Sequence, residues 1–176
     1  VYPIKPLMQT PKLTRWLTEE GSITDKLKAL TNQTHLEVLT HHFEQTDTWD
    51  INTLNLPKNT TTLHREILMW ADTTRCWYAR TILPEFVYHT ETALFNHLQT
   101  TALGELIHHH PEIKRTKINP YAIHAHMPEY HYLKRALKQN IATETLWGRV
   151  STFTIRNQFD FYLLEILLPG LLKYCP

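Results

Sequence analysis

The sequence has only four glycines and two cysteines among its 176 residues, and both shortages exclude classes of protein. Neither a GxGxxG loop nor a GxxxxGK loop occurs, so dinucleotide-binding and P-loop chemistry are excluded. Cys76 and Cys175 show no CxxC spacing, and we expect two reduced thiols rather than a disulfide framework or a zinc site. The GxSxG and HExxH patterns of common hydrolases and zinc proteases are also absent. An active site must therefore be found from other residues.

The chain also lacks a large net charge and a long hydrophobic run. Eighteen Lys and Arg residues against 17 Asp and Glu residues leave a net charge of +1, so we expect no nucleic-acid partner. The most apolar stretch, residues 163–172, is interrupted by Glu165, Pro169 and Gly170 and is shorter than the roughly 20 residues that span a bilayer. The start at Val1 suggests that a few leading residues are missing, and the segment after it has no apolar signal-peptide core. We therefore expect a cytoplasmic protein without a transmembrane segment.

The hydrophobic residues, 42% of the chain, are enough to form one core, so residues 1–176 are expected to fold as a single domain. Apolar residues at helical spacing predict two helix pairs, and Thr10 is a suitable cap for the first helix. Each pair has the pattern of a helix-turn-helix hairpin. The predicted helices cover residues 11–18 and 22–30 in the first pair, and residues 93–98 and 103–107 in the second.

Period-two alternation of apolar residues predicts strands, four of which form two antiparallel hairpins. The polar stretch 44–62 is expected to be a loop, and residues 108–145 resemble a long, poorly patterned connection. Strands near both ends of the chain with helices between them indicate an α+β fold on an antiparallel sheet. The predicted strands cover residues 35–43, 63–70, 75–83, 150–155 and 159–168.

Glu165 is the clearest candidate for chemistry because it interrupts an otherwise apolar strand. Side chains alternate along a strand, so Glu165 shares its face with Leu163 and Leu167. Two interpretations stay open from the residues alone. Glu165 either faces solvent on the wet side of a one-sided sheet, or it is buried beside a charged partner at a functional site.

Arg65 is the first candidate for that charged partner, because Leu63 and Ile67 on its face of the strand are apolar. A guanidinium in a closed pocket holds a carboxylate by two parallel N–H bonds, which a lysine cannot reproduce. The alternative is an ordinary surface ion pair. Arg80 and Arg149 lie in similar strands, and spacing alone selects none of the three arginines.

The twelve histidines are the most unusual feature of the composition, and several gather between residues 108 and 131. His124 and His126 would share one face of a strand, which suits a metal ion, but no third ligand at a fixed spacing is identifiable. We therefore expect polar surface histidines and no metal site.

Six short segments, taken together and in order, resemble the chorismate pyruvate-lyase family. The order and spacing of the set are far more specific than any single segment, and the set brackets most of the chain. Residues 108–145 depart from the family pattern, so no role is carried over to them. The segments are LTEEGSIT at 17–24, REIL at 65–68, ARTILP at 79–84, ALG at 102–104, LWGR at 146–149 and EILLP at 165–169.

The resemblance implies a fold and a site. The fold is one α+β domain with a six-stranded antiparallel sheet, helices on one face, and a buried cavity closed by two helix-turn-helix flaps, which the two predicted helix pairs match. In the implied site Arg65 holds the carboxylate of an aromatic ring, and Glu165 meets the ring hydroxyl. The backbone near Ile23 and Leu103 contacts the ligand. Family members often carry Met where this chain has Ile23, so only a backbone contact is expected there.

The same resemblance implies a lyase that converts chorismate to 4-hydroxybenzoate and pyruvate, the first committed step of bacterial ubiquinone synthesis. No metal or other cofactor is expected, and the protein is expected to be a monomer. The alternative is a non-catalytic effector-binding domain, because the same fold recurs in bacterial transcription regulators. Such a sensor normally follows a winged-helix DNA-binding domain, for which one core of this size leaves no room, so the lyase is preferred.

Overall fold

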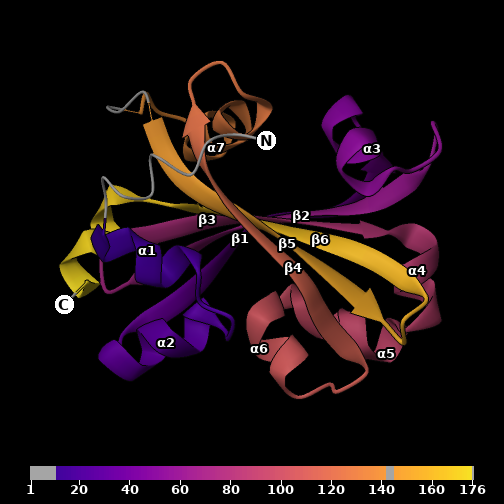
Figure 1. The fold of residues 1–176 in the computed structure, drawn as a ribbon, viewed down its shortest axis with the longest axis horizontal. Helices are drawn as coiled ribbons and strands as arrows, with labels where there is room; N and C mark the ends of the chain where they lie inside the picture. The colour runs from indigo at the N-terminus through magenta and orange to yellow at the C-terminus, as the bar shows by residue number, and fades with distance from the viewer. Residues whose placement is uncertain (1–10, 142–144, 176) are drawn as a thin grey trace.

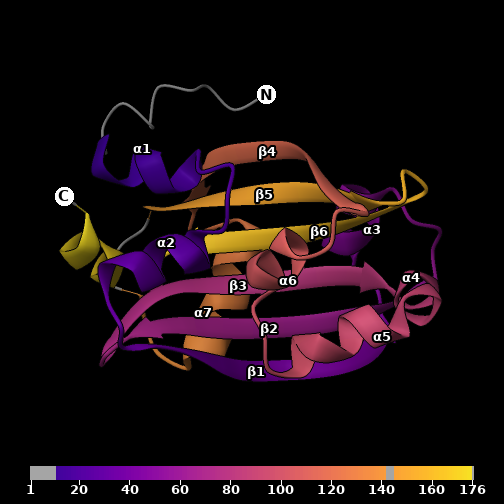
Figure 2. The ribbon, with the colours of Figure 1, turned by 90° about the horizontal axis from the view of Figure 1, so that it is seen from below.

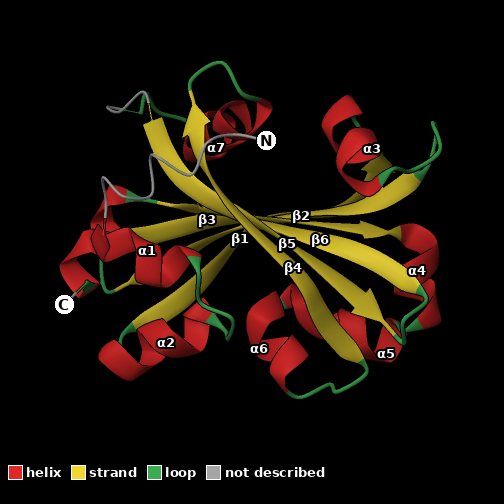
Figure 3. Cartoon of the chain, in the orientation of Figure 1, coloured by secondary structure: helices red, strands yellow, loops and turns green. Residues whose placement is uncertain are grey.

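The framework of the molecule is a six-stranded antiparallel sheet, seen in the computed structural model, which describes residues 11–141 and 145–175. Figure 1 shows the strands fanned across the molecule with helices on both sides, and Figure 3 marks helices and strands in the same view. The strands are β1 (Thr34–Gln45), β2 (Thr61–Ala71), β3 (Thr74–Pro84), β4 (Ile113–His124), β5 (Thr145–Ile155) and β6 (Phe159–Leu167). Their order in the sheet is β1-β2-β3-β6-β5-β4, so the last strand lies beside β3 in the middle.

Both predicted hairpins are present, and tight turns set their register. Asp72, between β2 and β3, has a φ of 53°, and Arg156 and Asn157, between β5 and β6, have φ values of 51° and 55°. Positive φ values in a short connection match the twist of the flanking strands. The second turn pairs Ile155 with Phe159, and this register continues along the whole β5–β6 hairpin.

Short helices connect the strands and cover both faces of the sheet. None in the described part of the chain is long and apolar enough to cross a membrane. The α-helices are α1 (Pro11–Leu17), α2 (Ile23–Leu30), α3 (Thr48–Leu54), α4 (Glu85–Thr90), α5 (Thr92–Phe95), α6 (Leu103–His108) and α7 (Pro128–Leu137). Two 3₁₀ helices, η2 (Asn96–Gln99) and η3 (Pro169–Tyr174), complete the set within the described residues.

Each strand sends alternate side chains to opposite faces of the sheet, and each face has its own core. The flap face, which carries Arg65, Ile67, Ala79, Leu163 and Glu165, is covered by α1, α2, α5 and α6, seen in front of the strands in Figure 2. The opposite face, here the α7 face, is covered by α3 and α7. Its sheet residues are His64, Glu66, Tyr78, Arg80 and Leu164.

The two predicted helix pairs are present as α1–α2 and as the segment from α5 to α6. Ser22 caps α2, because its Oγ accepts a hydrogen bond from the backbone N–H of Asp25 at 3.2 Å. Gly104 in α6 approaches this cap so closely that a Cβ there would lie 3.1 Å from Ser22 Oγ. An alanine there would require the Ser22 side chain to shift by a few tenths of an ångström. Thr10, the expected cap of the first helix, lies outside the described residues.

Two segments that were expected to be irregular contain regular elements, so both predictions were wrong. The expected loop 44–62 contains α3, which begins with a capping box between Asp47 and Asp50. The expected connection 108–145 contains the edge strand β4 and the helix α7. These elements escaped recognition because α3 buries a single residue, Asp50, and β4 exposes most of its side chains to some degree. Neither gives a clear apolar period.

The expectation of helices on one face was incomplete. Tyr132 and Leu133 of α7 belong to the core of the α7 face together with Tyr78 and Ile166 of the sheet. Trp49 of α3 packs against the same core. The sheet is therefore covered on both sides.

Candidate active site

Arg65 is buried on the flap face, and none of the described residues gives it an acidic partner. Its side chain lies on β2 and is 1% exposed. Nε donates to the carbonyl oxygen of Leu98 at 2.7 Å, and Nη2 donates to that of Thr101 at 2.9 Å. Within the described ranges no carboxylate lies at ion-pair distance from Arg65, and burial lowers the pKa of its guanidinium to about 10. Arg65 thus remains a cation at neutral pH.

Glu165 is also buried on the flap face, 5% exposed, on β6. Its Oε2 accepts a hydrogen bond from Nε of Arg149 at 2.6 Å. Arg149 lies directly opposite on β5 and is fully buried. The charge-assisted hydrogen bond explains how a carboxylate is accommodated among apolar residues of a central strand.

Close backbone packing supports this pair. Gly148, next to Arg149, lies against β6, where a Cβ would be only 2.8 Å from the carbonyl oxygen of Glu165 and 2.5 Å from Cδ1 of Ile123. A side chain at this position would displace the strand that carries Glu165. The close packing of β5 against β6 therefore explains why a glycine precedes Arg149 in the LWGR segment.

Arg65 and Glu165 line the same small cavity between the sheet and both helix pairs. The space left open there is about 10 Å³, roughly enough for one water molecule. Thr24 of α2 and Leu103 and Gly104 of α6 form its cover. The remaining lining residues are Ile67, Trp77, Ala79, Ala102 and Leu163. The cavity thus combines one guanidinium, one carboxylate and apolar walls.

Three of the four site residues expected from the sequence meet at this cavity: Arg65, Leu103 and Glu165. Ile23 is buried, but its neighbour Thr24, and not Ile23 itself, lines the space. The alternatives that placed Glu165 on a wet face and Arg65 in a surface ion pair were wrong, because both side chains are buried. The contacts of these residues with a ligand stay predictions.

Sequence reasoning did not identify Arg149 as the partner of Glu165, although a signal was present. The turn at 156–158 pairs Ile155 with Phe159. Arg149 lies six positions before Ile155, and Glu165 lies six positions after Phe159, so an unbroken antiparallel register places them opposite each other.

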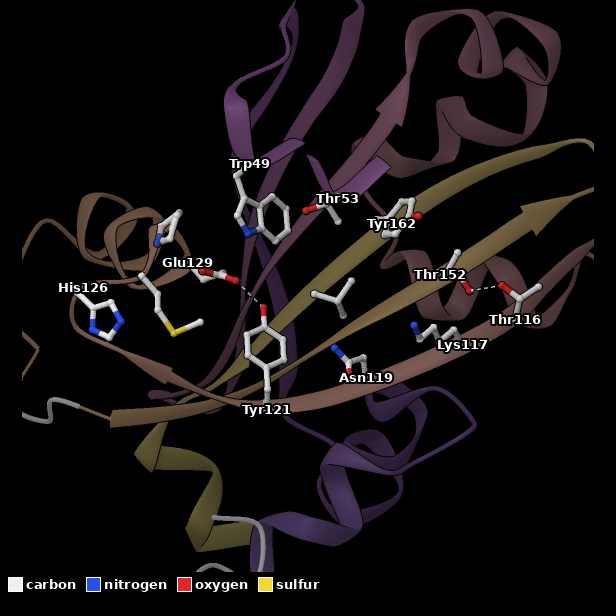
Figure 4. A pocket seen from close by; sticks show the side chains of 13 residues that line it. Trp49, Thr53, Thr116, Lys117, Asn119, Tyr121, His126, Glu129, Thr152 and Tyr162 are labelled. Atoms are coloured by element: carbon white, nitrogen blue, oxygen red, sulfur yellow. Dashed lines mark hydrogen bonds between the residues drawn. The ribbon is translucent and has the colours of Figure 1, made fainter. Parts of the chain in front are cut away.

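A larger groove lies on the α7 face, between α3, α7 and strands β4 to β6 (Figure 4). Its volume is about 790 Å³, and Trp49, Tyr121 and Tyr162 are among its lining residues. Tyr121 donates a hydrogen bond to Glu129 at 2.8 Å, and the lining lysine, Lys117, is exposed. No arginine lines the groove. The groove exceeds the cavity in size, but it lacks a buried cation facing a carboxylate, so the cavity is the stronger candidate for catalysis.

The histidines are placed mainly at the surface, as expected. His108, His109, His126 and His131 are exposed, and His124 is partly exposed. Within residues 11–141 and 145–175, no group of three or more His, Cys, Asp or Glu side chains is arranged to hold a metal ion. Cys76 and Cys175 are free and buried.

Sequence comparison links most of the chain to one family. Residues 5–172 match the family described as chorismate lyase. A probable chorismate pyruvate-lyase from Pseudoalteromonas translucida (strain TAC 125) is 29% identical over 160 residues, which cover 90% of this chain and 85% of the relative. A probable chorismate pyruvate-lyase from Shewanella sp. (strain MR-4) is 28% identical over 172 residues, covering 94% and 83% of the two chains.

Structural comparison finds the same fold in regulatory domains. The ligand-binding domain of a putative GntR-family transcriptional regulator from Bordetella bronchiseptica superposes with a TM-score of 0.55 at 13% identity, covering 86% of this chain and 88% of that one. The effector domain of PhnF from Mycobacterium smegmatis gives a TM-score of 0.56 at 14% identity, covering 86% and 90%. At these identities the likeness concerns the α+β fold alone.

Proposed function

Because this chain belongs to the chorismate lyase family, we propose that it converts chorismate to 4-hydroxybenzoate and pyruvate, the first committed step of ubiquinone biosynthesis. One observation carries the proposal: Arg65 is a buried cation without an acidic partner among the described residues, and it lines the same cavity as Glu165. The carboxylate of a ligand is well suited to supply the negatively charged partner that this guanidinium lacks.

The reaction asks little of the protein beyond position and charge. Chorismate is a dicarboxylate whose ring becomes aromatic when the enolpyruvyl ether bond breaks and a ring hydrogen leaves as a proton. The departing enol takes up a proton and becomes pyruvate. Aromatisation drives the reaction, so a fixed cation and a preorganised pocket supply the catalysis. Treatment with EDTA is expected to leave turnover intact.

Arg65 and Glu165 take the two ends of the ring in this proposal. Arg65 holds the ring carboxylate, and Glu165 meets the hydroxyl, which it orients in its first role. Its second role is to accept the ring proton that is lost on aromatisation. The backbone near Ile23 and Leu103 closes over the ligand. The positions of Thr24 and Leu103 in the cover of the cavity support this arrangement.

The small size of the cavity also predicts strong product inhibition. A space of about 10 Å³ admits an aromatic ring only after the helix pairs move. 4-Hydroxybenzoate carries the ring carboxylate and the opposite oxygen of the substrate, so it should bind tightly and leave slowly. We expect a burst of aromatic product in pre-steady-state experiments, and an inhibition constant below the KM for chorismate.

Incubation of the purified protein with chorismate tests the proposed function. 4-Hydroxybenzoate, followed by absorbance, and pyruvate, measured with lactate dehydrogenase, should appear in equal amounts, and an Arg65→Ala sample provides the matched control. Binding of 4-hydroxybenzoate without turnover would favour an effector-binding domain instead. Absence of both turnover and binding would overturn the proposal. We place the reaction in the cytoplasm and expect a monomer, which gel filtration checks.

A further inference from the structure

Arg149 is a buried guanidinium that joins the candidate catalytic carboxylate to the first helix pair. Its Nε donates to Oε2 of Glu165 at 2.6 Å. Its Nη1 donates to the backbone carbonyl oxygens of Trp16 and Glu19, at 3.2 Å and 2.6 Å. Trp16 lies in α1 and Glu19 follows its end, so the guanidinium is held on both sides.

The placement of Arg149 is unfavourable for stability alone. Arg149 is fully buried, and its Nη2 has no hydrogen-bond partner among the described residues. A buried donor without a partner costs free energy that an apolar side chain of the same size would not. A role in the site explains why an arginine occupies this position.

The contacts fix one oxygen of Glu165. Backbone carbonyl oxygens at a helix end are rigid acceptors, so they set the plane of the Arg149 guanidinium. That guanidinium occupies Oε2, and no hydrogen bond to Oε1 is formed by the described residues. Glu165 lines the cavity. The carboxylate is thereby held in one rotamer with an oxygen left for a ligand.

We propose that Arg149 is a positioning residue for the reaction: it holds the Glu165 carboxylate in the orientation that meets the ring hydroxyl. This inference rests on the proposed function. Its effect passes mainly through Glu165, so removing Arg149 should cost far more while Glu165 carries a carboxylate than in its absence, when only the contacts with the first helix pair are lost.

Arg115 on β4 provides a matched comparison. Its Nη1 donates to the carbonyl oxygens of Glu20 and Gly21, so it also ties the sheet to the first helix pair. The charge of Glu165 acts on Arg115 over a distance, but the two side chains form no hydrogen bond among the described contacts. A substitution of Arg115 therefore disturbs the seating of the helix pair without releasing the carboxylate.

A double-mutant cycle with Arg149→Met and Glu165→Gln tests the inference. We expect Arg149→Met alone to lower kcat by about tenfold or more, with KM changed by less than about threefold, because the loss concerns orientation in the transition state. In the Glu165→Gln background the same substitution should lower kcat by less than about twofold. The double variant leaves no unpaired buried charge at this position, which favours its folding. Thermal unfolding and 4-hydroxybenzoate binding check that each variant is folded.

Two further variants keep the test decisive. Arg149→Lys retains the cation but cannot serve Glu165 and both carbonyl oxygens, so it should show the same dependence on Glu165 with a smaller loss, and it replaces Arg149→Met if that variant does not fold. Arg115→Met should lower kcat by the same factor with and without Glu165. Equal factors for Arg149→Met in both backgrounds would overturn the inference while leaving the proposed function intact. A wild type that neither turns over chorismate nor binds product would overturn both.

Discussion

Arg65 and Arg80 lie on neighbouring strands and on opposite faces of the same sheet, and their guanidinium groups have different kinds of partner. Arg80 forms an ion pair with Asp50 of α3 through both terminal nitrogens. Burial alone would lower the pKa of Arg80, but the hydrogen bonds and the charge of Asp50 outweigh it and raise the pKa. Among the described residues the partners of Arg65 are carbonyl oxygens alone, and burial lowers its pKa to about 10.

We propose that this difference separates a structural arginine, Arg80, from a ligand-binding one, Arg65. On the α7 face the protein supplies the countercharge itself, and neighbouring groups are similarly paired: Tyr78 donates to Glu66 at 2.6 Å. On the flap face the described residues supply Arg65 with carbonyl partners but with no countercharge. Burial of an arginine alone therefore does not indicate a binding site, whereas burial without an acidic partner marks a candidate.

The largest expected effect on stability comes from Arg80. Arg80→Met leaves Asp50 buried without its partner, and we expect a loss of about 3–5 kcal/mol in the free energy of unfolding. Urea denaturation measures it, with Arg135→Met as the control, since the Arg135 side chain is exposed and its 3.6 Å contact with the buried Glu66 should contribute about 1 kcal/mol or less. Equal losses for the two variants would remove the distinction between a buried and an exposed arginine on this face.

Arg65 should instead carry the largest effect on ligand binding. We expect Arg65→Lys to be nearly as damaging as Arg65→Ala, because one ammonium group cannot reproduce two parallel N–H bonds to a carboxylate. The loss in kcat/KM should be about 30- to 5000-fold, or about 2–5 kcal/mol. A lysine variant with half the wild-type kcat/KM would remove Arg65 from the site, and Arg80→Lys should leave KM within about threefold of wild type.

The comparison of the two arginines also shows what the sequence could predict. Both lie in apolar strands, and their partners come from distant segments: Asp50 from α3, which was expected to be loop, and the carbonyl oxygens of Leu98 and Thr101. Because every residue carries a backbone carbonyl, residue types do not reveal which carbonyl accepts a hydrogen bond. Strand spacing therefore selected neither arginine, and only the resemblance to a family pointed to Arg65.

Other features were accessible because they depend on local rules. Alternation and turn residues predicted both hairpins, and the apolar spacing predicted both helix pairs. The register of the β5–β6 hairpin is by itself enough to place Arg149 opposite Glu165. In contrast, α3 buries one residue and β4 buries few, so neither shows a clear period. A signal for α7 was present but missed: Pro128 stands at the first position of the helix, and Tyr130, Leu133 and Leu137 recur at helical spacing.

Glu165→Gln distinguishes two roles of Glu165 on the flap face, and its expected effect is smaller than that of the Arg65 variants. The amide keeps the shape and a hydrogen-bonding group, so a residue that mainly orients the hydroxyl should lose only about tenfold in kcat, with tight product binding retained. Stopped-flow turnover and product titration measure both quantities. A loss of about 10²–10⁴ would instead indicate general-base catalysis, and wild-type behaviour of Glu165→Ala would remove Glu165 from the site.

The smallest predicted effect is the pH dependence of stability on the α7 face. Burial, followed by the charge of Arg80, lowers the pKa of His64 below its ordinary 6.5 against the opposing effect of Asp50 and Glu44. As the pH falls below about 6.5, the unfolded chain binds a proton before the folded chain does, so stability is full above this pH and decreases below it. Urea midpoints between pH 8 and 5 test this. His64→Gln should flatten the profile, and an unchanged slope would contradict the assignment to His64.

We propose that the flap face holds Arg65 as a buried cation for the carboxylate of an aromatic ligand. Calorimetric titration of the wild-type protein with 4-hydroxybenzoate and with 4-hydroxybenzamide tests it directly, because the two ligands share the ring and hydroxyl and differ only at the group that should meet Arg65. We predict that the amide binds at least about 30-fold more weakly. Affinities equal within about threefold would contradict the account, because Arg65 would then contribute no charge recognition.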